Sequence, residues 1–133
     1  MVRFLLVDDN ENFLDSVERY LASLGSSDLN CVGKATSGEE AVRLSVELKP
    51  DLVLMDCAMP GIGGLVATRL IKQETGSPKI VILTIHESDE YRKAASMAGA
   101  DDFVTKSELT NKMSALLESM FHVTFGPSRI PAR

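Results

Sequence analysis

The sequence predicts an α/β domain in which a five-stranded parallel sheet is doubly wound, with helices on both faces. Three short runs are wholly apolar without alternation, which is typical of strands buried on both faces; they are residues 4–7, 52–55 and 80–83. Segments with helical spacing of apolar residues separate these runs, and the connections are short. This alternation predicts parallel strands joined by right-handed crossovers. Five strands suit an open sheet better than a closed barrel, which needs eight.

The first predicted helix covers residues 10–24. Its apolar residues recur at steps of three and four, which gives one apolar stripe. Asn10 is the expected N-cap, and Gly25 is expected to end the helix. The run that follows, residues 29–35, is less apolar and predicts a more exposed strand.

The next two helices begin at small or polar residues. Ser37 and Glu40 have the spacing of a capping box, which predicts the start of the second helix. That helix is expected to end before Pro50, because the residue before a proline avoids helical angles. A third helix is expected over residues 64–75, with Gly76 after it.

The last third of the chain predicts a thin, mostly polar helix over residues 88–97 and the shortest strand, at a sheet edge, over residues 102–105. Ser107 is expected to cap the final helix. Residues 1–121 are therefore expected to form one domain. Residues 122–133 contain glycine and two prolines without periodicity, and they predict a flexible tail or the stub of a linker.

Composition excludes several classes of function. The 133 residues are 44% hydrophobic and 25% charged, as in an ordinary globular domain. A net charge of −5 without a basic run disfavours direct binding of nucleic acid. The sequence shows neither a signal peptide nor an apolar stretch of about 18 residues, so we expect no membrane contact and a cytoplasmic location. Cys31 and Cys57 lack the spacing of a redox or zinc motif and are expected to be reduced thiols.

Polar side chains follow the predicted strands at the edge where parallel strands end. These residues are Asp8 and Asp9 after the first strand, Asp56 after the third, Thr84 after the fourth and Lys106 after the fifth. Ligands of open parallel sheets bind at this edge. Neighbouring carboxylates repel one another unless a cation lies among them, and hard oxygen ligands with room for water favour Mg²⁺.

Such a group of residues is suited to phosphoryl transfer onto a carboxylate. Asp56 follows the central strand and is the natural acceptor. Mg²⁺ and Lys106 would neutralise the oxygens of the transferred group, and the Thr84 hydroxyl would hold one of them. Each residue alone is common at strand ends and turns, but five in this order predict a functional site.

The sequence resembles the receiver domain of two-component response regulators over residues 3–121. The motifs that carry the resemblance are Val7-Asp8-Asp9, Asp56-Cys57-Ala58-Met59-Pro60-Gly61 with Gly64, Thr84, and Phe103-Val104-Thr105-Lys106. The resemblance implies the flavodoxin-like (βα)5 fold with strand order 2-1-3-4-5. It also implies a phosphorelay component that is no enzyme beyond its own phosphorylation and dephosphorylation.

The resemblance further implies how the phosphoryl group arrives. Asp56 would be phosphorylated by a cognate histidine kinase or a phosphotransfer protein. Mg²⁺ would be bound by Asp9, Asp56 and the backbone carbonyl of Ala58, with Asp8 acting mainly through water.

The resemblance also implies a conformational switch. Lys106 and Thr84 would contact the phosphoryl group, Thr84 would move toward it, and the aromatic at Phe103 would turn inward, which changes the face of the last strand and its flanking helices. Phe103 stands where tyrosine is usual, so the switch would report by packing. Ile85 replaces a usually small residue on the rim of the site; it either crowds the site and slows both loading and hydrolysis, or packs against the adjacent helix. Its neighbour His86 is expected on the same rim, exposed and incidental.

The residues after the first predicted strand argue against two other classes of protein. A flavin carrier needs a Ser/Thr/Gly-rich phosphate loop there, and a phosphatase of the haloacid dehalogenase type needs Asp-x-Asp; the chain has Asp8-Asp9-Asn10-Glu11. A receiver-like binding module that works without phosphorylation stays open.

The output of the switch stays open too. The stretches at residues 84–86 and 106–109 resemble LuxR/NarL-type receivers, which favours transcription regulation through an unknown output domain or protein. A monomer or weak homodimer is expected.

Overall fold

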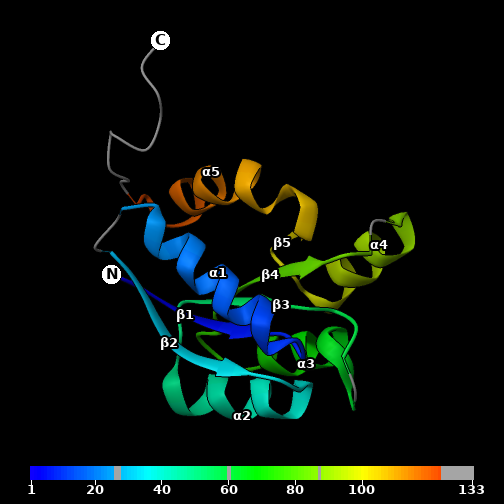
Figure 1. Ribbon diagram of the computed structural model, residues 1–133. Helices are drawn as coiled ribbons and strands as arrows, with labels where there is room; N and C mark the ends of the chain where they lie inside the picture. The colour runs from blue at the N-terminus through cyan, green and yellow to red at the C-terminus, as the bar shows by residue number, and fades with distance from the viewer. Residues whose placement is uncertain (26–27, 60, 87, 124–133) are drawn as a thin grey trace.

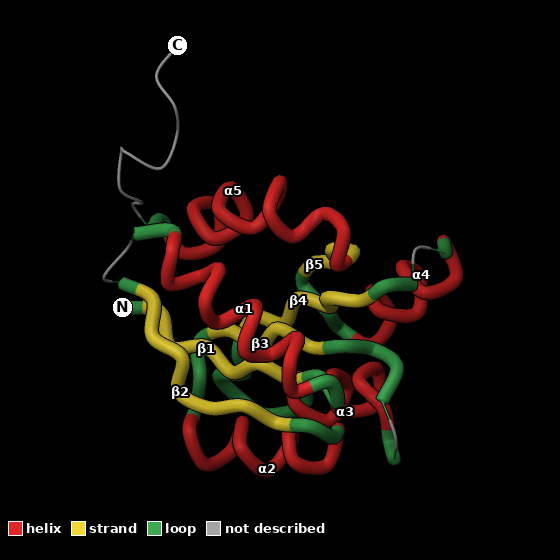
Figure 2. Tube along the Cα trace, in the orientation of Figure 1, coloured by secondary structure: helices red, strands yellow, loops and turns green. Residues whose placement is uncertain are grey.

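Strands and helices alternate along the chain in a computed structural model, which describes residues 1–25, 28–59, 61–86 and 88–123 (Figures 1 and 2). The strands are β1 (Val2–Val7), β2 (Leu29–Ala35), β3 (Leu52–Met55), β4 (Lys79–Thr84) and β5 (Asp102–Thr105). The helices are α1 (Glu11–Ser23), α2 (Gly38–Leu48), α3 (Gly63–Lys72), α4 (Asp89–Ala98) and α5 (Leu109–Phe121), with a 3-10 turn, Lys106–Glu108, before α5.

The five strands form one parallel sheet in the order β2-β1-β3-β4-β5. This confirms the predicted fold class and the strand order that the resemblance implied. β5 lies at an edge, as expected, but β3 is equally short, with four residues each. The carboxyl ends of β1 and β3, which are neighbours, lie at the centre of the sheet.

Helices cover both faces of the sheet, with α1 and α5 on one face and α2, α3 and α4 on the other (Figure 1). Neighbouring residues of a central strand face opposite cores: Leu6 packs with α1 and α5, whereas Leu5 packs with the other helices. Both side chains are fully buried. The strand therefore needs apolar residues at successive positions, which explains the absence of alternation.

The first two helices begin where the sequence predicts. Asn10 caps α1, because its side-chain oxygen accepts a hydrogen bond of 3.2 Å from the N–H of Phe13. Ser37 caps α2 by accepting from the N–H of Glu40 at 3.1 Å. The Glu40 carboxylate completes the motif one residue further out, on the N–H of Thr36 at 2.9 Å.

The expected cap of the last helix is wrong. Ser107 lies inside the 3-10 turn, and its hydroxyl lies 3.1 Å from that of Thr105. The carboxylate of Glu108 instead accepts from the N–H of Thr105 at 3.1 Å. β5 thus runs directly into a tight turn, which leaves no extended residue at position 107 to act as a cap.

The C-terminal segment is described only as far as Val123. α5 ends at Phe121, and residues 124–133 lie outside the described part, so the tail over residues 122–133 stays a prediction. No helix in the described ranges has the length and apolar character needed to cross a bilayer.

Candidate functional site

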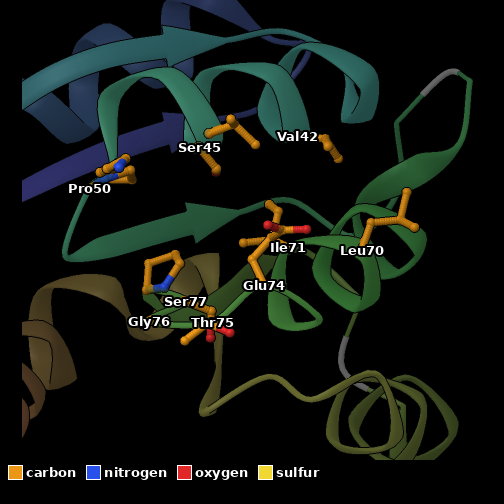
Figure 3. A pocket seen from close by; sticks show the side chains of 12 residues that line it. Val42, Ser45, Pro50, Leu70, Ile71, Glu74, Thr75, Gly76 and Ser77 are labelled. Atoms are coloured by element: carbon orange, nitrogen blue, oxygen red, sulfur yellow. The ribbon is translucent and has the colours of Figure 1, made fainter.

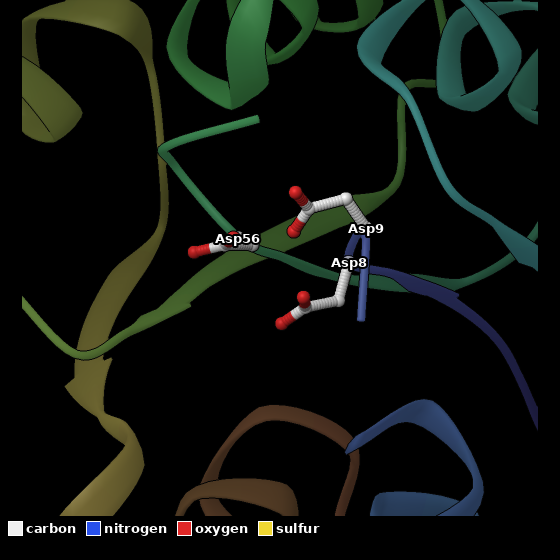
Figure 4. A group of neighbouring side chains, drawn as sticks. All are labelled: Asp8, Asp9 and Asp56. Carbon is white, nitrogen blue, oxygen red and sulfur yellow. The ribbon is translucent and has the colours of Figure 1, made fainter. Parts of the chain in front are cut away.

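Three carboxylates meet at the carboxyl ends of β1 and β3 (Figure 4). Asp8, Asp9 and Asp56 each place one oxygen within 4.8 Å of the others. The N–H of Asp56 donates to the carbonyl of Val7 at 2.9 Å, which continues the β1–β3 pairing and fixes the third carboxylate beside the first two. Asp8 and Asp56 are buried, whereas Asp9 is exposed. The structure therefore brings together the acidic residues that the sequence singled out.

Both oxygens of the Asp8 carboxylate are held by neighbours. The backbone N–H of Asn10 donates to Oδ1 at 2.9 Å, and the ammonium of Lys106 lies 2.7 Å from Oδ2. Lys106 stands at the start of the turn after β5, so β5 delivers a positive charge to the acidic cluster, as predicted. The partner of Lys106 in this structure is Asp8.

Phe13 is a neighbour of the site that the sequence does not predict. The Lys106 ammonium lies 4.1 Å from the centroid of its ring, a cation–π contact. In the sequence Phe13 is simply one residue of the apolar stripe of α1. Nothing in its spacing indicates the lysine, which lies near the other end of the chain.

Burial raises the pKa of the Asp56 carboxyl above its ordinary value, and the charge of Asp8 raises it further. The charge of Lys106 and the backbone N–H of Ala58 act in the opposite direction. A cation among the carboxylates would favour ionised Asp56. Two buried carboxylates and an exposed one offer hard oxygen ligands with access for water, so these residues fit Mg²⁺.

Thr84 ends β4 and is completely buried. Its hydroxyl oxygen accepts two hydrogen bonds, from the thiol of Cys57 at 3.3 Å and from the backbone N–H of His86 at 3.2 Å. The sequence predicts Cys57 only as a reduced thiol. The structure places the Cys57 thiol beside the hydroxyl of Thr84, the predicted switch residue, and we call this group the switch hydroxyl. Burial raises the pKa of the Cys57 thiol.

The remaining predicted residues lie around this centre. Phe103 is buried, and the guanidinium of Arg92 lies 4.7 Å from its ring centroid; its inward turn on phosphorylation stays a prediction. Ile85 is 70% exposed, and its effect on phosphoryl loading and hydrolysis stays a prediction. His86 is half-buried and stacks on Tyr91 at 4.6 Å between ring centroids, so the expectation that it is exposed is wrong; that it is incidental to function stays a prediction.

The loop after β3 is packed tightly onto the start of α3. A Cβ added at Gly64 would lie 1.8 Å from the carbonyl oxygen of Asp56. The N–H of Gly64 also donates to the carbonyl of Cys57 at 3.1 Å. Only glycine permits this approach, which ties α3 to the backbone of Asp56.

The described residues also line surface hollows. An open one of about 570 Å³ adjoins Asp9 and the start of α1. Another, of about 330 Å³, lies between α2 and α3 (Figure 3). Its lining includes Pro50 and Pro78, which precede β3 and β4, so it lies at the opposite edge of the sheet from the carboxylates. The charged groups of the candidate site, Asp8, Asp9, Asp56 and Lys106, lie at the carboxyl ends of the strands.

Comparison with known proteins places these observations in a family. The chain matches the family model "Response regulator receiver domain" over residues 4–118. It is 38% identical over 121 residues to response regulator GacA of Pseudomonas aeruginosa, a match that covers 91% of this chain and 56% of GacA. It is 33% identical over 133 residues to transcriptional regulatory protein LiaR of Bacillus subtilis, covering the whole chain and 61% of LiaR. The chain thus spans little more than half the length of these relatives.

A solved structure agrees with these matches. The crystal structure of a two-component response regulator of the LuxR family from Aurantimonas sp. SI85-9A1 is 35% identical, with a TM-score of 0.79. The alignment covers 90% of this chain and 86% of that one. Because the matched residues 4–118 include every strand end of the acidic site, this chain belongs to the receiver domain family of response regulators.

Proposed function

We propose that the domain is a phosphorylation-dependent switch of a two-component phosphorelay, with Asp56 as the phosphoryl acceptor. The observation that carries the proposal is that Asp56 is buried beside two further carboxylates, at the same sheet edge as Lys106. Family membership supports a histidine kinase or a phosphotransfer protein as the donor.

The transfer itself needs few groups. A carboxylate oxygen of Asp56 attacks the phosphorus of a phosphohistidine; an O–P bond forms, the N–P bond breaks, and the leaving imidazole keeps the electron pair and takes a proton from water. The Lys106 ammonium balances negative charge at the site, and the Thr84 hydroxyl donates to one phosphoryl oxygen. Asp9, Asp56 and the backbone carbonyl of Ala58 would hold Mg²⁺, which supplies further positive charge against the phosphoryl oxygens.

The switch follows from the position of Thr84. Thr84 in β4 is paired with Thr105 in β5. When the Thr84 hydroxyl engages the phosphoryl group, the position of the end of β4 changes relative to β5. Phe103 in β5 transmits the change by repacking, which alters the face made by β5 and its flanking helices. An output domain or a separate protein would read that face.

Relatives support transcription regulation as the output. GacA and LiaR are regulators that are much longer than the part matched here. We therefore propose that this domain does not bind nucleic acid itself. We also propose that it acts in the cytoplasm and that it is a monomer or a weak homodimer. A binding module that works without phosphorylation is the alternative.

Incubation with acetyl phosphate and Mg²⁺, followed by the mass of the intact protein, tests the proposal. The wild type should gain one phosphoryl group, and the gain should disappear with a chelator or in Asp56→Asn. Asp89→Asn, at an exposed carboxylate of α4, should load like the wild type. A wild type that gains no phosphoryl group while it keeps its fold would favour the binding module.

A further inference from the structure

The hydroxyl oxygen of Thr84 is held on two sides by hydrogen-bond donors. The thiol of Cys57 donates at 3.3 Å and the backbone N–H of His86 at 3.2 Å. Thr84 has no exposed surface and Cys57 is 7% exposed, so water does not compete for these bonds. Both lone pairs of the switch hydroxyl are thereby engaged.

The two donors differ in origin. The N–H of His86 belongs to the backbone and is available whatever the side chain. The thiol belongs to the residue directly after Asp56, and the loop that carries it is fixed by the bond from the N–H of Gly64 to the carbonyl of Cys57. The side chain at position 57 therefore decides whether a second donor reaches the switch hydroxyl.

We propose that Cys57 is a positioning residue that latches Thr84 away from the phosphoryl position, and so sets how readily the site engages a phosphoryl group. The proposal rests on the proposed function of Asp56. To donate its proton to a phosphoryl oxygen, the Thr84 hydroxyl has to turn toward Asp56, and that movement breaks the bond from the thiol. Any free energy by which the thiol stabilises the resting position of Thr84 makes engagement of the phosphoryl group less favourable by the same amount.

The size of the effect follows from the bond. A thiol is a weak donor, so its loss should shift the equilibrium of the switch hydroxyl by a small factor, about threefold. A serine at position 57 keeps a donor. An alanine removes the donor and leaves the backbone bond from His86 in place.

Beryllofluoride with Mg²⁺, a phosphoryl analogue that binds to carboxylates, provides the test by titration calorimetry. The wild type should bind one equivalent, Cys57→Ala should bind about threefold more tightly, and Cys57→Ser, whose hydroxyl is a stronger donor than the thiol, should bind no more tightly than the wild type. Cys31→Ala removes the half-buried thiol of β2 and should leave the affinity unchanged. Should Cys57→Ala fail to fold, Cys57→Val, which also lacks a donor and fills the space, should show the same tightening.

Coupling to Thr84 separates a latch from a packing effect. In a Thr84→Ala background, Cys57→Ala should no longer change the affinity. The methyl resonance of Thr84 in the analogue-free Cys57→Ala protein should also move toward its analogue-bound position. Equal affinities of wild type and Cys57→Ala, or a tightening that persists without the Thr84 hydroxyl, would overturn the latch. A wild type that binds no analogue would instead contradict the proposed function. In that case the latch would still be overturned by a Thr84 methyl resonance that does not move in Cys57→Ala.

Discussion

The ammonium of Lys106 and the carboxylate of Asp8 form an ion pair of 2.7 Å that joins the turn after β5 to the end of β1. The side chain of Asp8 is 3% exposed and that of Lys106 18% exposed, so solvent screens the pair only weakly. This contact places the positive charge of the site within the acidic cluster, next to the proposed acceptor.

Replacement of Lys106 should have opposite effects on two functions of the site. Lys106→Gln removes the positive charge near the carboxylates, so Mg²⁺ should bind more tightly. Loading from acetyl phosphate should nevertheless slow by at least about tenfold, because the charge on the phosphoryl oxygens is less balanced. Calorimetry with Mg²⁺ and the mass of the intact protein measure the two effects. Lys93→Gln, at an exposed lysine of α4, is the control; a loss of loading with unchanged Mg²⁺ affinity would contradict this account of the charge.

Phe13 should matter through its contact with Lys106. Phe13→Leu keeps an apolar side chain but removes the ring face, so loading should slow by about threefold at saturating Mg²⁺. Phe13→Tyr keeps the ring and should load like the wild type. If leucine and tyrosine behave alike in a loading time course, the cation–π contact does not position the lysine.

The carboxylate of Asp56, the proposed acceptor, should destabilise the metal-free domain. Asp56 is buried beside the charge of Asp8, and both conditions disfavour its ionised form. Asp56→Asn should therefore raise the melting temperature without Mg²⁺ by a few degrees, the shift that about 1 kcal/mol gives in a domain of this size. Mg²⁺ should stabilise the wild type more than the variant. Thermal unfolding with and without Mg²⁺ measures both effects, and an Asp56→Asn protein that melts below the wild type in chelator would contradict the prediction.

Gly64 should tolerate no side chain. The Cβ of Gly64→Ala would overlap the carbonyl oxygen of Asp56 at 1.8 Å, so the free energy of unfolding should fall by about 3 kcal/mol. Gly76→Ala is the matched control, because Gly76 has a φ of +73° but nothing within 4 Å of an added Cβ. It should cost only the left-handed backbone conformation, about 1 kcal/mol. Urea unfolding compares the two, and equal losses would show that the close approach is not what position 64 requires.

Glu108 should make stability depend on pH. Its hydrogen bond with Lys112 and the N–H of Thr105 lower its pKa from 4.5 to about 2. Because the folded-state pKa lies below the ordinary value, the stabilising contribution is present above about pH 4.5 and is lost as the pH falls toward 2. Glu108→Gln should therefore melt below the wild type at pH 7, and the gap should narrow below pH 4.5. A gap that stays constant down to pH 3 would contradict the assignment.

Most of the fold could be predicted from local patterns. Unbroken apolar runs such as residues 52–55 become strands buried on both faces, and helical spacing marks the segments between them. The strand ends could be predicted as well. Because parallel strands end at the same edge of the sheet, the proximity of Asp8, Asp9 and Asp56 could be predicted too. The cap at Ser107 could not, because the tight turn depends on the bond between Glu108 and Thr105 rather than on the serine itself.

The neighbours of the site were harder to predict than its charged residues. Phe13 and Lys106 meet only because α1 and the end of β5 lie on the same side of the sheet. Cys57 reaches Thr84 because β3 and β4 are adjacent, and a lone cysteine gives no sign of that in sequence. Ile85 lies toward solvent and His86 stacks on Tyr91, positions that depend on how the chain turns between β4 and α4.

The most direct test of the central claim is the chemical identity of residue 56 after phosphorylation. The domain is loaded with acetyl phosphate and Mg²⁺ and then reduced with borohydride, which converts an aspartyl phosphate to homoserine; peptide masses locate the change. The account predicts homoserine at position 56 and at no other aspartate, and none after treatment with a chelator. Homoserine at Asp8 or Asp9 with Asp56 intact, or a folded domain that yields no homoserine at all, would contradict it.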